Sequence, residues 1–173
     1  YSFAELVATE NPPYYVLEIS SFQLDGIEHF APHIAVLLNI TPDHLDRYDY
    51  KFENYINSKF RIAMNQTEND YLIYDADDEV ITQWLSTHTI KSKLIPFSIE
   101  KELPQGAFLK DNKIYIMLEN QTTEIDVEEI SLRGKHNIKN TMAASVAARL
   151  VNIRNNSLRE SLKGFKGAPH RLE

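Results

Sequence analysis

Short apolar runs recur along the chain, with helical or polar stretches between them. Four of these runs have the length of strands: residues 14–19 (YYVLEI), 33–40 (HIAVLLNI), 71–75 (YLIYD) and 93–99 (KLIPFSI). They are continuously apolar, which is typical of parallel strands that are buried on both faces, whereas strands with one solvated face alternate. The pattern therefore predicts an α/β protein.

The segments between the strands have the apolar spacing of helices. The predicted helices lie near the N-terminus (SFAELVATE), over 52–66, from about Asp78, over 137–151 and over 157–165. In the last of these, Ser157 and Glu160 have the spacing of a capping box, so we expect Ser157 to be the N-cap.

Residues 106–127 depart from this order of strands and helices. Apolar and polar residues alternate there and are interrupted by DN and EN pairs, as in antiparallel hairpins. We therefore predict a three-layer, mostly parallel sheet with helices on both faces and a small antiparallel strand extension. No internal repeat or low-complexity stretch interrupts this organisation.

The composition limits the class of partner. The chain has 173 residues, 43% apolar, with a net charge of −7 and no cysteine. An acidic surface disfavours nucleic acid and anionic membranes as partners. No apolar run approaches the length of a membrane span, and no signal-peptide pattern is present. We expect a cytoplasmic protein, and the absence of disulfides fits that compartment.

The first apolar run stops on a carboxylate, Glu18, which Ser20 and Gln23 follow. In open α/β sheets, ligands bind beyond the carboxyl ends of the strands. An acid at such an end resembles the magnesium-holding carboxylate of nucleotide-binding proteins, since Mg²⁺ takes oxygen ligands. A strand-end acid that caps a helix explains the residue pattern equally well.

Two further stretches carry candidate chemistry. The segment TPDHLDR brings Asp43, His44, Asp46 and Arg47 within five residues, which permits metal binding, proton transfer or anion binding. Taken alone, a solvated loop is the simpler interpretation. Lys59 lies on a predicted helix beside apolar residues, where a lysine can lose its proton, although most such lysines only extend to solvent.

Near the C-terminus, Asn137 and Asn140 are three residues apart and share a face of the predicted helix. Their amides suit a purine edge or phosphate oxygens, and simple N-capping by Asn137 is the alternative. The terminal His170 and Arg171 add a stacking ring and a guanidinium, which suit a base and a phosphate.

Together, these stretches resemble a known family. The segments EISSFQLD, LLNITPDHLDRY, YINSKFRIAMNQ, YDADD, LRGKHNIKNTMAA and GFKGAPHRLE occur in this order. They are similar to the central, P-loop NTPase-like domain of the Mur ligases over nearly the whole chain, most weakly over 80–130. Within the family, SSFQL and DHLDRY resemble the branch that adds D-glutamate to UDP-MurNAc-L-Ala through an acyl phosphate, using ATP and Mg²⁺, in peptidoglycan synthesis and hence cell-wall growth and division.

The resemblance implies roles for matching positions. Lys59 and His44 are the implied catalytic residues, and Lys59 is the implied site of a carbamate formed with CO₂. The implied metal-side residues are Glu18, His44 and Lys59. The implied substrate contacts are Ser20, Gln23 and Arg47, and the implied nucleotide contacts are Asn137, Asn140, His170 and Arg171.

The sequence also departs from the family pattern. A Gly-rich phosphate-binding loop of the GTNGKT type is absent from these 173 residues, because the pair Gly134–Lys135 has neither the Gly-rich turn nor the following hydroxyl. We therefore expect residues 1–173 to be one partial domain, with the loop upstream and the N-terminal UDP-binding and C-terminal domains elsewhere in a monomeric enzyme. We expect the isolated chain not to ligate. A folylpolyglutamate-type ligase and a non-catalytic nucleotide-binding scaffold remain the alternatives.

Overall fold

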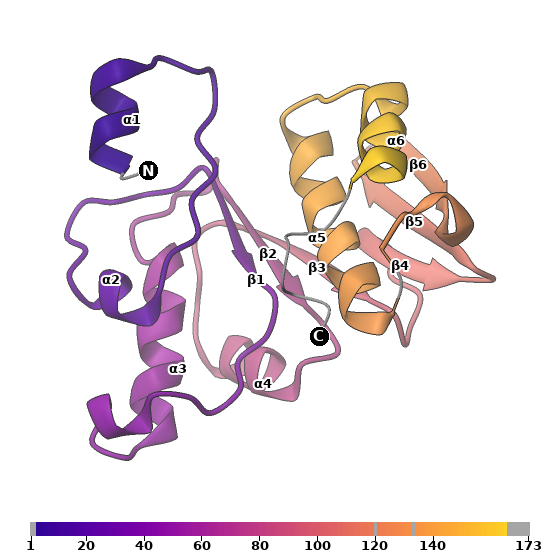
Figure 1. Ribbon diagram of the computed structural model, residues 1–173. Helices are drawn as coiled ribbons and strands as arrows, with labels where there is room; N and C mark the ends of the chain where they lie inside the picture. The colour runs from indigo at the N-terminus through magenta and orange to yellow at the C-terminus, as the bar shows by residue number, and fades with distance from the viewer. Residues whose placement is uncertain (1–2, 120, 133, 166–173) are drawn as a thin grey trace.

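The computed structural model describes residues 3–119, 121–132 and 134–165, which form one six-stranded sheet with helices around it (Figure 1). The strands are β1 (Ile34–Leu37), β2 (Tyr71–Asp75), β3 (Lys93–Ser98), β4 (Gly106–Lys110), β5 (Lys113–Leu118) and β6 (Gln121–Asp126). They lie side by side in chain order. The pairings from β1 to β4 are parallel, and the last two are antiparallel. The predicted fold class is confirmed.

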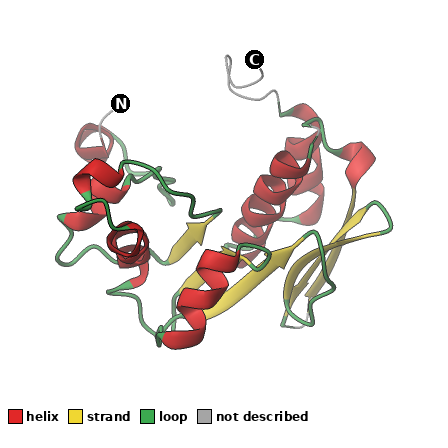
Figure 2. Ribbon diagram, turned by 90° about the horizontal axis from the view of Figure 1, so that it is seen from below, coloured by secondary structure: helices red, strands yellow, loops and turns green. Residues whose placement is uncertain are grey.

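The sheet is covered on both faces, and strand β2 shows why its residues are apolar throughout. Its Leu72 packs with α3 (Phe52–Phe60) and α4 (Glu79–Thr87), whereas its Ile73 packs with α5 (Lys135–Leu150) and α6 (Asn155–Gly164). Successive strand residues point to opposite faces, so both must be apolar when both faces are buried. Figure 2 shows helices on the two sides of the sheet.

The remaining elements are short. They are the helices α1 (Phe3–Thr9) and α2 (Ser21–Asp25) and the 3₁₀ turns η1 (Leu45–Arg47), η2 (Arg61–Ala63) and η3 (Val127–Glu129). Across the described ranges, every helix is too short or too polar to cross a membrane.

The prediction of a buried strand at 14–19 is wrong. This segment belongs to no strand, and it is part of the irregular connection between α1 and α2 (Figure 1). The side chain of Val16 is 98% exposed, and Tyr14 is also exposed. A strand is stabilised by its neighbour's hydrogen bonds and by a covered face, and in the described residues the sheet ends at β1. Apolar sequence alone does not create that neighbour.

The antiparallel extension is confirmed. Asp111 and Asn112 join β4 to β5 with φ values of 48° and 60°, the left-handed pair that a two-residue hairpin turn requires. The β4 strand begins at Gly106, whose φ is 100°. A Cβ there would lie 1.8 Å from the Pro96 carbonyl oxygen, so only glycine allows β4 to approach β3.

Candidate functional site

The candidate residues of the described chain fall into two groups. In the first group, Glu18 lies on the segment before α2, and the other members lie on or next to α2, η1 and α3: Ser20, Gln23, His44, Arg47 and Lys59. Asn137 and Asn140 lie on α5, which covers the other face of the sheet. The predictions for His170 and Arg171 lie outside the described residues.

The first group begins with a closed capping box on α2. The backbone N–H of Gln23 donates to Ser20 Oγ at 3.3 Å, and the backbone N–H of Ser20 donates to the Gln23 side-chain Oε1 at 2.9 Å. Ser20 and Gln23 therefore have a structural role, which sequence reasoning missed although the two residues have the S-x-x-Q spacing of a capping box. Their role as substrate contacts stays a prediction.

The same signature misled us at the other end of the chain. Helix α6 begins at Asn155 and has Arg154 as its N-cap, so Ser157 is the third residue inside the helix. The capping-box prediction for Ser157 is wrong. Spacing identifies a possible box, and the point at which the chain enters the helix decides whether it forms.

Phe22 of α2 brings His44 and Arg47 together, and sequence reasoning missed it. The His44 ring centroid lies 5.1 Å from the Phe22 ring centroid, and Arg47 Cζ lies 5.0 Å from the same Phe22 centroid. His44 has a left-handed backbone (φ 51°), and its amide N–H donates to Asp43 Oδ1 at 2.8 Å. One exposed aromatic ring thus holds a titratable ring and a cation at the same surface.

Lys59 lies on the last turn of α3, half-buried, with Nζ 5.5 Å from the Tyr55 ring centroid. Burial raises the pKa of Tyr55, and the charge of Asp43 raises it further. The Phe22 ring, which the His44 ring contacts, stacks on the Tyr48 ring with 6.1 Å between the centroids. The Tyr48 ring lies 5.4 Å from the Tyr55 ring, so a series of ring contacts links His44 to Lys59. The fold brings the catalytic candidates His44 and Lys59 to the same part of the molecule.

Glu18 is exposed on the segment that enters α2. Within the described ranges, no three His, Cys, Asp or Glu side chains are grouped as a metal site would require. Mg²⁺ in phosphoryl-transfer sites takes only one or two protein carboxylates and fills its shell with phosphate and water. The assignment of Glu18, His44 and Lys59 to a metal stays a prediction, because these residues do not form a complete site by themselves.

The second group lies at the start of α5. The helix begins at Lys135 with Gly134 as its N-cap (φ 97°), so Asn137 is not the N-cap. Asn137 and Asn140 are the third and sixth helical residues and share one face. Asn140 is exposed, as a ligand contact requires.

A buried charged cluster holds this end of α5 against the carboxyl end of β2. Lys139 Nζ lies 2.7 Å from Asp75 Oδ2 and 3.4 Å from Asp77 Oδ2. Asp77 Oδ2 also accepts the Ile99 amide N–H at 2.8 Å, and Asp77 Oδ1 accepts the Ser98 hydroxyl. The sequence indicated a polar strand end at Asp75–Asp78, but Lys139 was not expected, since nothing near it in sequence is its partner.

The pKa values of this cluster follow from its burial. Burial raises the pKa of Asp75, and the neighbouring lysine only partly opposes this. Burial acts to lower the pKa of Lys139, but the hydrogen bond and charge of Asp75 and the charge of Asp77 outweigh it, so the pKa is raised. Lys139 therefore stays charged and fixes the first turns of α5 to β2.

The arrangement is that of a three-layer α/β domain with its polar residues at strand ends and helix starts. Residues 2–148 match the family model described as Mur ligase middle domain. The chain belongs to the Mur ligase family.

Two relatives carry the same name, UDP-N-acetylmuramoylalanine--D-glutamate ligase. The protein of Christiangramia forsetii is 56% identical over 172 residues, which are 99% of this chain and 39% of that protein. The protein of Bacteroides thetaiotaomicron is 46% identical over 172 residues, 99% of this chain and 38% of that protein. The chain thus spans well under half the length of these relatives.

Solved structures support the fold. MurF from Acinetobacter baumannii is 18% identical and aligns with a TM-score of 0.60 over 82% of this chain and 31% of that one. A second match is UDP-N-acetylmuramate:L-alanyl-gamma-D-glutamyl-meso-diaminopimelate ligase (MPL) from Neisseria meningitides. It is 19% identical and has a TM-score of 0.60 over 79% of this chain and 41% of that one. At this identity the likeness concerns the fold alone.

Proposed function

We propose that this chain is the middle domain of an ATP-dependent ligase that joins D-glutamate to UDP-MurNAc-L-Ala. The observation that carries the proposal is the 56% identity, over 99% of the chain, to a protein named UDP-N-acetylmuramoylalanine--D-glutamate ligase. In the reaction, the substrate carboxylate takes the γ-phosphoryl group and ADP leaves. The amine then attacks the acyl carbon, phosphate leaves, and the nitrogen loses a proton.

The arrangement of the first group supports a substrate-side role. Phe22, His44 and Arg47 present an aromatic face, an imidazole and a cation on one surface, which suits an anionic peptide substrate. We assign Ser20, Gln23 and Arg47 to this side of the reaction. Because Ser20 and Gln23 bond to each other, their part is to fix the start of α2, on which Phe22 is carried.

We assign Asn137 and Asn140, with His170 and Arg171, to the nucleotide. The support is the position of the two amides on one face of α5, beside the Lys139 cluster that fixes the helix to β2. ATP supplies the phosphoryl group that activates the carboxylate.

We assign Glu18, His44 and Lys59 to the metal side. Mg²⁺, when bound, neutralises charge on the transferring phosphate. A neutral lysine amine adds to CO₂ and loses a proton, so Lys59 would give an anionic carbamate, which is an oxygen ligand. The position of Lys59 supports this assignment, because Lys59 is half-buried on α3, directly after Ser58, and its Nζ lies 5.5 Å from the Tyr55 ring centroid.

The test uses the full-length protein that contains this chain. Phosphate release should require ATP, D-glutamate and UDP-MurNAc-L-Ala together. Lys59→Ala should lower kcat by about 100-fold or more, the scale of losing one preorganised electrostatic group. Added acetate or formate should restore part of the rate, because a free carboxylate replaces the carbamate.

The matched control is Lys51→Ala, since Lys51 is an exposed lysine at the start of the same helix. It should turn over at the wild-type rate. Wild-type turnover by Lys59→Ala would remove the carbamate role. Release with another amino acid only would assign the protein to a sibling ligase, and no release from folded protein would favour a scaffold.

A further inference from the structure

Two buried hydroxyl groups hold the carboxylate of Asp25. The Tyr48 hydroxyl donates to Asp25 Oδ2 at 2.9 Å, and the Ser58 hydroxyl donates to Asp25 Oδ1 at 2.6 Å. Tyr48 is only 7% exposed and Ser58 only 3%. Asp25 itself is exposed, but each of its carboxylate oxygens accepts a hydroxyl from a residue that is otherwise packed in the core. Because the acceptor is a carboxylate, both are charge-assisted hydrogen bonds.

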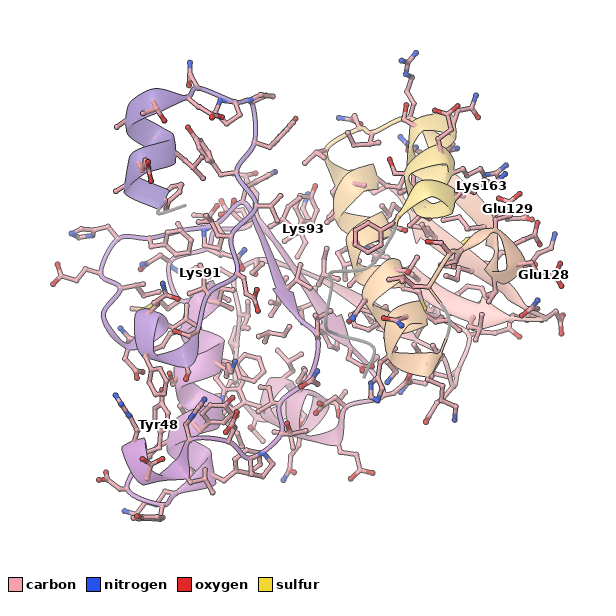
Figure 3. All side chains as sticks on the ribbon, in the orientation of Figure 1. Tyr48, Lys91, Lys93, Glu128, Glu129 and Lys163 are labelled. Atoms are coloured by element: carbon pink, nitrogen blue, oxygen red, sulfur yellow. The ribbon has the colours of Figure 1, made fainter. Side chains whose placement is uncertain are left out.

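The three residues come from three different elements. Asp25 ends α2, Tyr48 directly follows η1, and Ser58 lies on α3. Ser58 Oγ also lies 3.0 Å from the Ser21 carbonyl oxygen and 3.2 Å from the Tyr48 hydroxyl, which closes the cluster. Figure 3 shows Tyr48 beside α3.

A second contact fixes the same helix ends. Arg61, three residues after Ser58, donates from Nε to the Leu24 carbonyl at 2.7 Å and from Nη2 to the Ile27 carbonyl at 3.0 Å. The end of α2 is thus attached to the end of α3 by the Asp25 carboxylate, by the Leu24 carbonyl group and by the Ile27 carbonyl group just after the helix.

These elements cannot hold their geometry alone. Helix α2 has five residues, far fewer than an isolated helix needs. The loop before α3 includes His44, Asp49 and Tyr50 with φ values of 51°, 55° and 55°, a conformation that non-glycine residues rarely adopt. Contacts from elsewhere must therefore keep this arrangement in place.

The same elements carry the substrate-side candidates. Ser20 caps α2 and Gln23 lies in its first turn. His44 precedes η1 and Arg47 ends it, and Lys59 directly follows Ser58 on α3. We propose that Asp25, Tyr48 and Ser58 form a positioning network. During ligation, this network sets the distances between the candidates on α2, those at η1, and Lys59 on α3. This inference rests on the proposed function. The network residues touch the elements and not the reacting atoms, and an error of 1 Å in such a site can cost 100-fold in rate.

The experiment uses the full-length enzyme with Tyr48→Phe and Ser58→Ala, each of which removes one hydroxyl. Both variants should lower kcat/KM for UDP-MurNAc-L-Ala by about 10-fold or more. The KM for ATP should stay within about twofold, because Asn137 and Asn140 lie on α5 across the sheet. A purely structural role would lower the melting temperature but leave both parameters unchanged below it.

Two further variants complete the test. Tyr50→Phe removes a hydroxyl from the same loop, but the Tyr50 side chain is 79% exposed, so its kinetics should equal the wild type. Ser58→Thr keeps the hydroxyl and should recover most of the loss seen in Ser58→Ala. Wild-type kcat/KM in folded Tyr48→Phe and Ser58→Ala would overturn the positioning network. A wild-type enzyme that makes no amide would instead overturn the proposed function.

Discussion

The two ends of the described chain are stabilised in different ways. The region from β4 through α5 has a continuous apolar core, in which Ile114, Ile116, Ile125 and Met142 are almost fully buried. The region from α1 to the start of β1 has few such residues, and α1 itself buries none. Its structured part, α2 and the segment after it, buries Leu24 and is also attached by hydrogen bonds from α3 and the residues that follow α3.

These bonds form a series along the chain. Asn65 donates to the Glu28 and Phe30 carbonyl groups, and Gln66 donates to the Pro32 and Tyr71 carbonyl groups, at 2.8–3.0 Å. Apart from the Tyr71 carbonyl of β2, these groups and the Ile27 carbonyl bonded by Arg61 belong to the irregular segment between α2 and β1, whose carbonyls no strand or helix would pair. The comparison teaches that regular elements need an apolar face, whereas an irregular segment near a site needs particular polar partners.

The largest effect should come where the hairpin extension meets the parallel sheet. Gly106→Ala should lower the free energy of unfolding by about 4 kcal/mol, because it combines a strained positive φ with backbone overlap against Pro96. Urea denaturation of the 173-residue chain measures this. Gly164→Ala is the control, since a Cβ there has no heavy atom within 4 Å. Equal stability of the two variants would show that β4 can move away from β3.

The next largest difference between the two regions should come from shortening one apolar side chain in each. Ile116→Ala should cost about 3 kcal/mol, because Ile116 is 1% exposed and a cavity would remain. Val16→Ala should change stability by less than about 0.5 kcal/mol, because its side chain is almost entirely exposed. Denaturation midpoints of both variants test this. A large loss for Val16→Ala would mean that the N-terminal segment is buried in solution.

Lys139 connects α5 to the end of β2 through Asp75 and Asp77. Lys139→Met should cost about 2 kcal/mol at neutral pH, because it leaves Asp75 and Asp77 without their cation. The pKa of Lys139 is raised above its ordinary 10.5, so its contribution is full below that value and is lost as pH rises through the higher folded value. The stability difference from wild type, measured from pH 8 upward, should therefore shrink only above about pH 10.5. A difference that is constant throughout would contradict the ion pair.

The smallest effect should be at the capping box. Ser20→Ala should cost about 1 kcal/mol, because it removes the acceptor of the Gln23 amide. Ser157→Ala is the matched control, since Ser157 is inside α6 and caps nothing. Its change should be within about 0.5 kcal/mol, as for other surface positions. A larger loss at Ser157 than at Ser20 would reverse the assignment of the caps.

The sequence by itself determined most of the regular structure. The runs at 33–40, 71–75 and 93–99 became β1, β2 and β3, and the DN turn became a left-handed hairpin turn. Asp78 caps α4 by accepting the Ile81 amide N–H. These features follow from local preference and from burial on two faces, both of which leave a pattern in adjacent residues.

Tertiary structure decided what depends on partners distant in the chain. The run at 14–19 has the composition of a strand but has no neighbour to pair with in the described residues. Lys139 finds Asp75 across 64 residues, and Ser58 finds Asp25 across 33. No local pattern predicts such pairs, because the sequence around a helical lysine or serine is the same whether or not the fold places a carboxylate next to it. Pairing, burial and hydrogen bonding are properties of two surfaces, and only the folded chain brings both together.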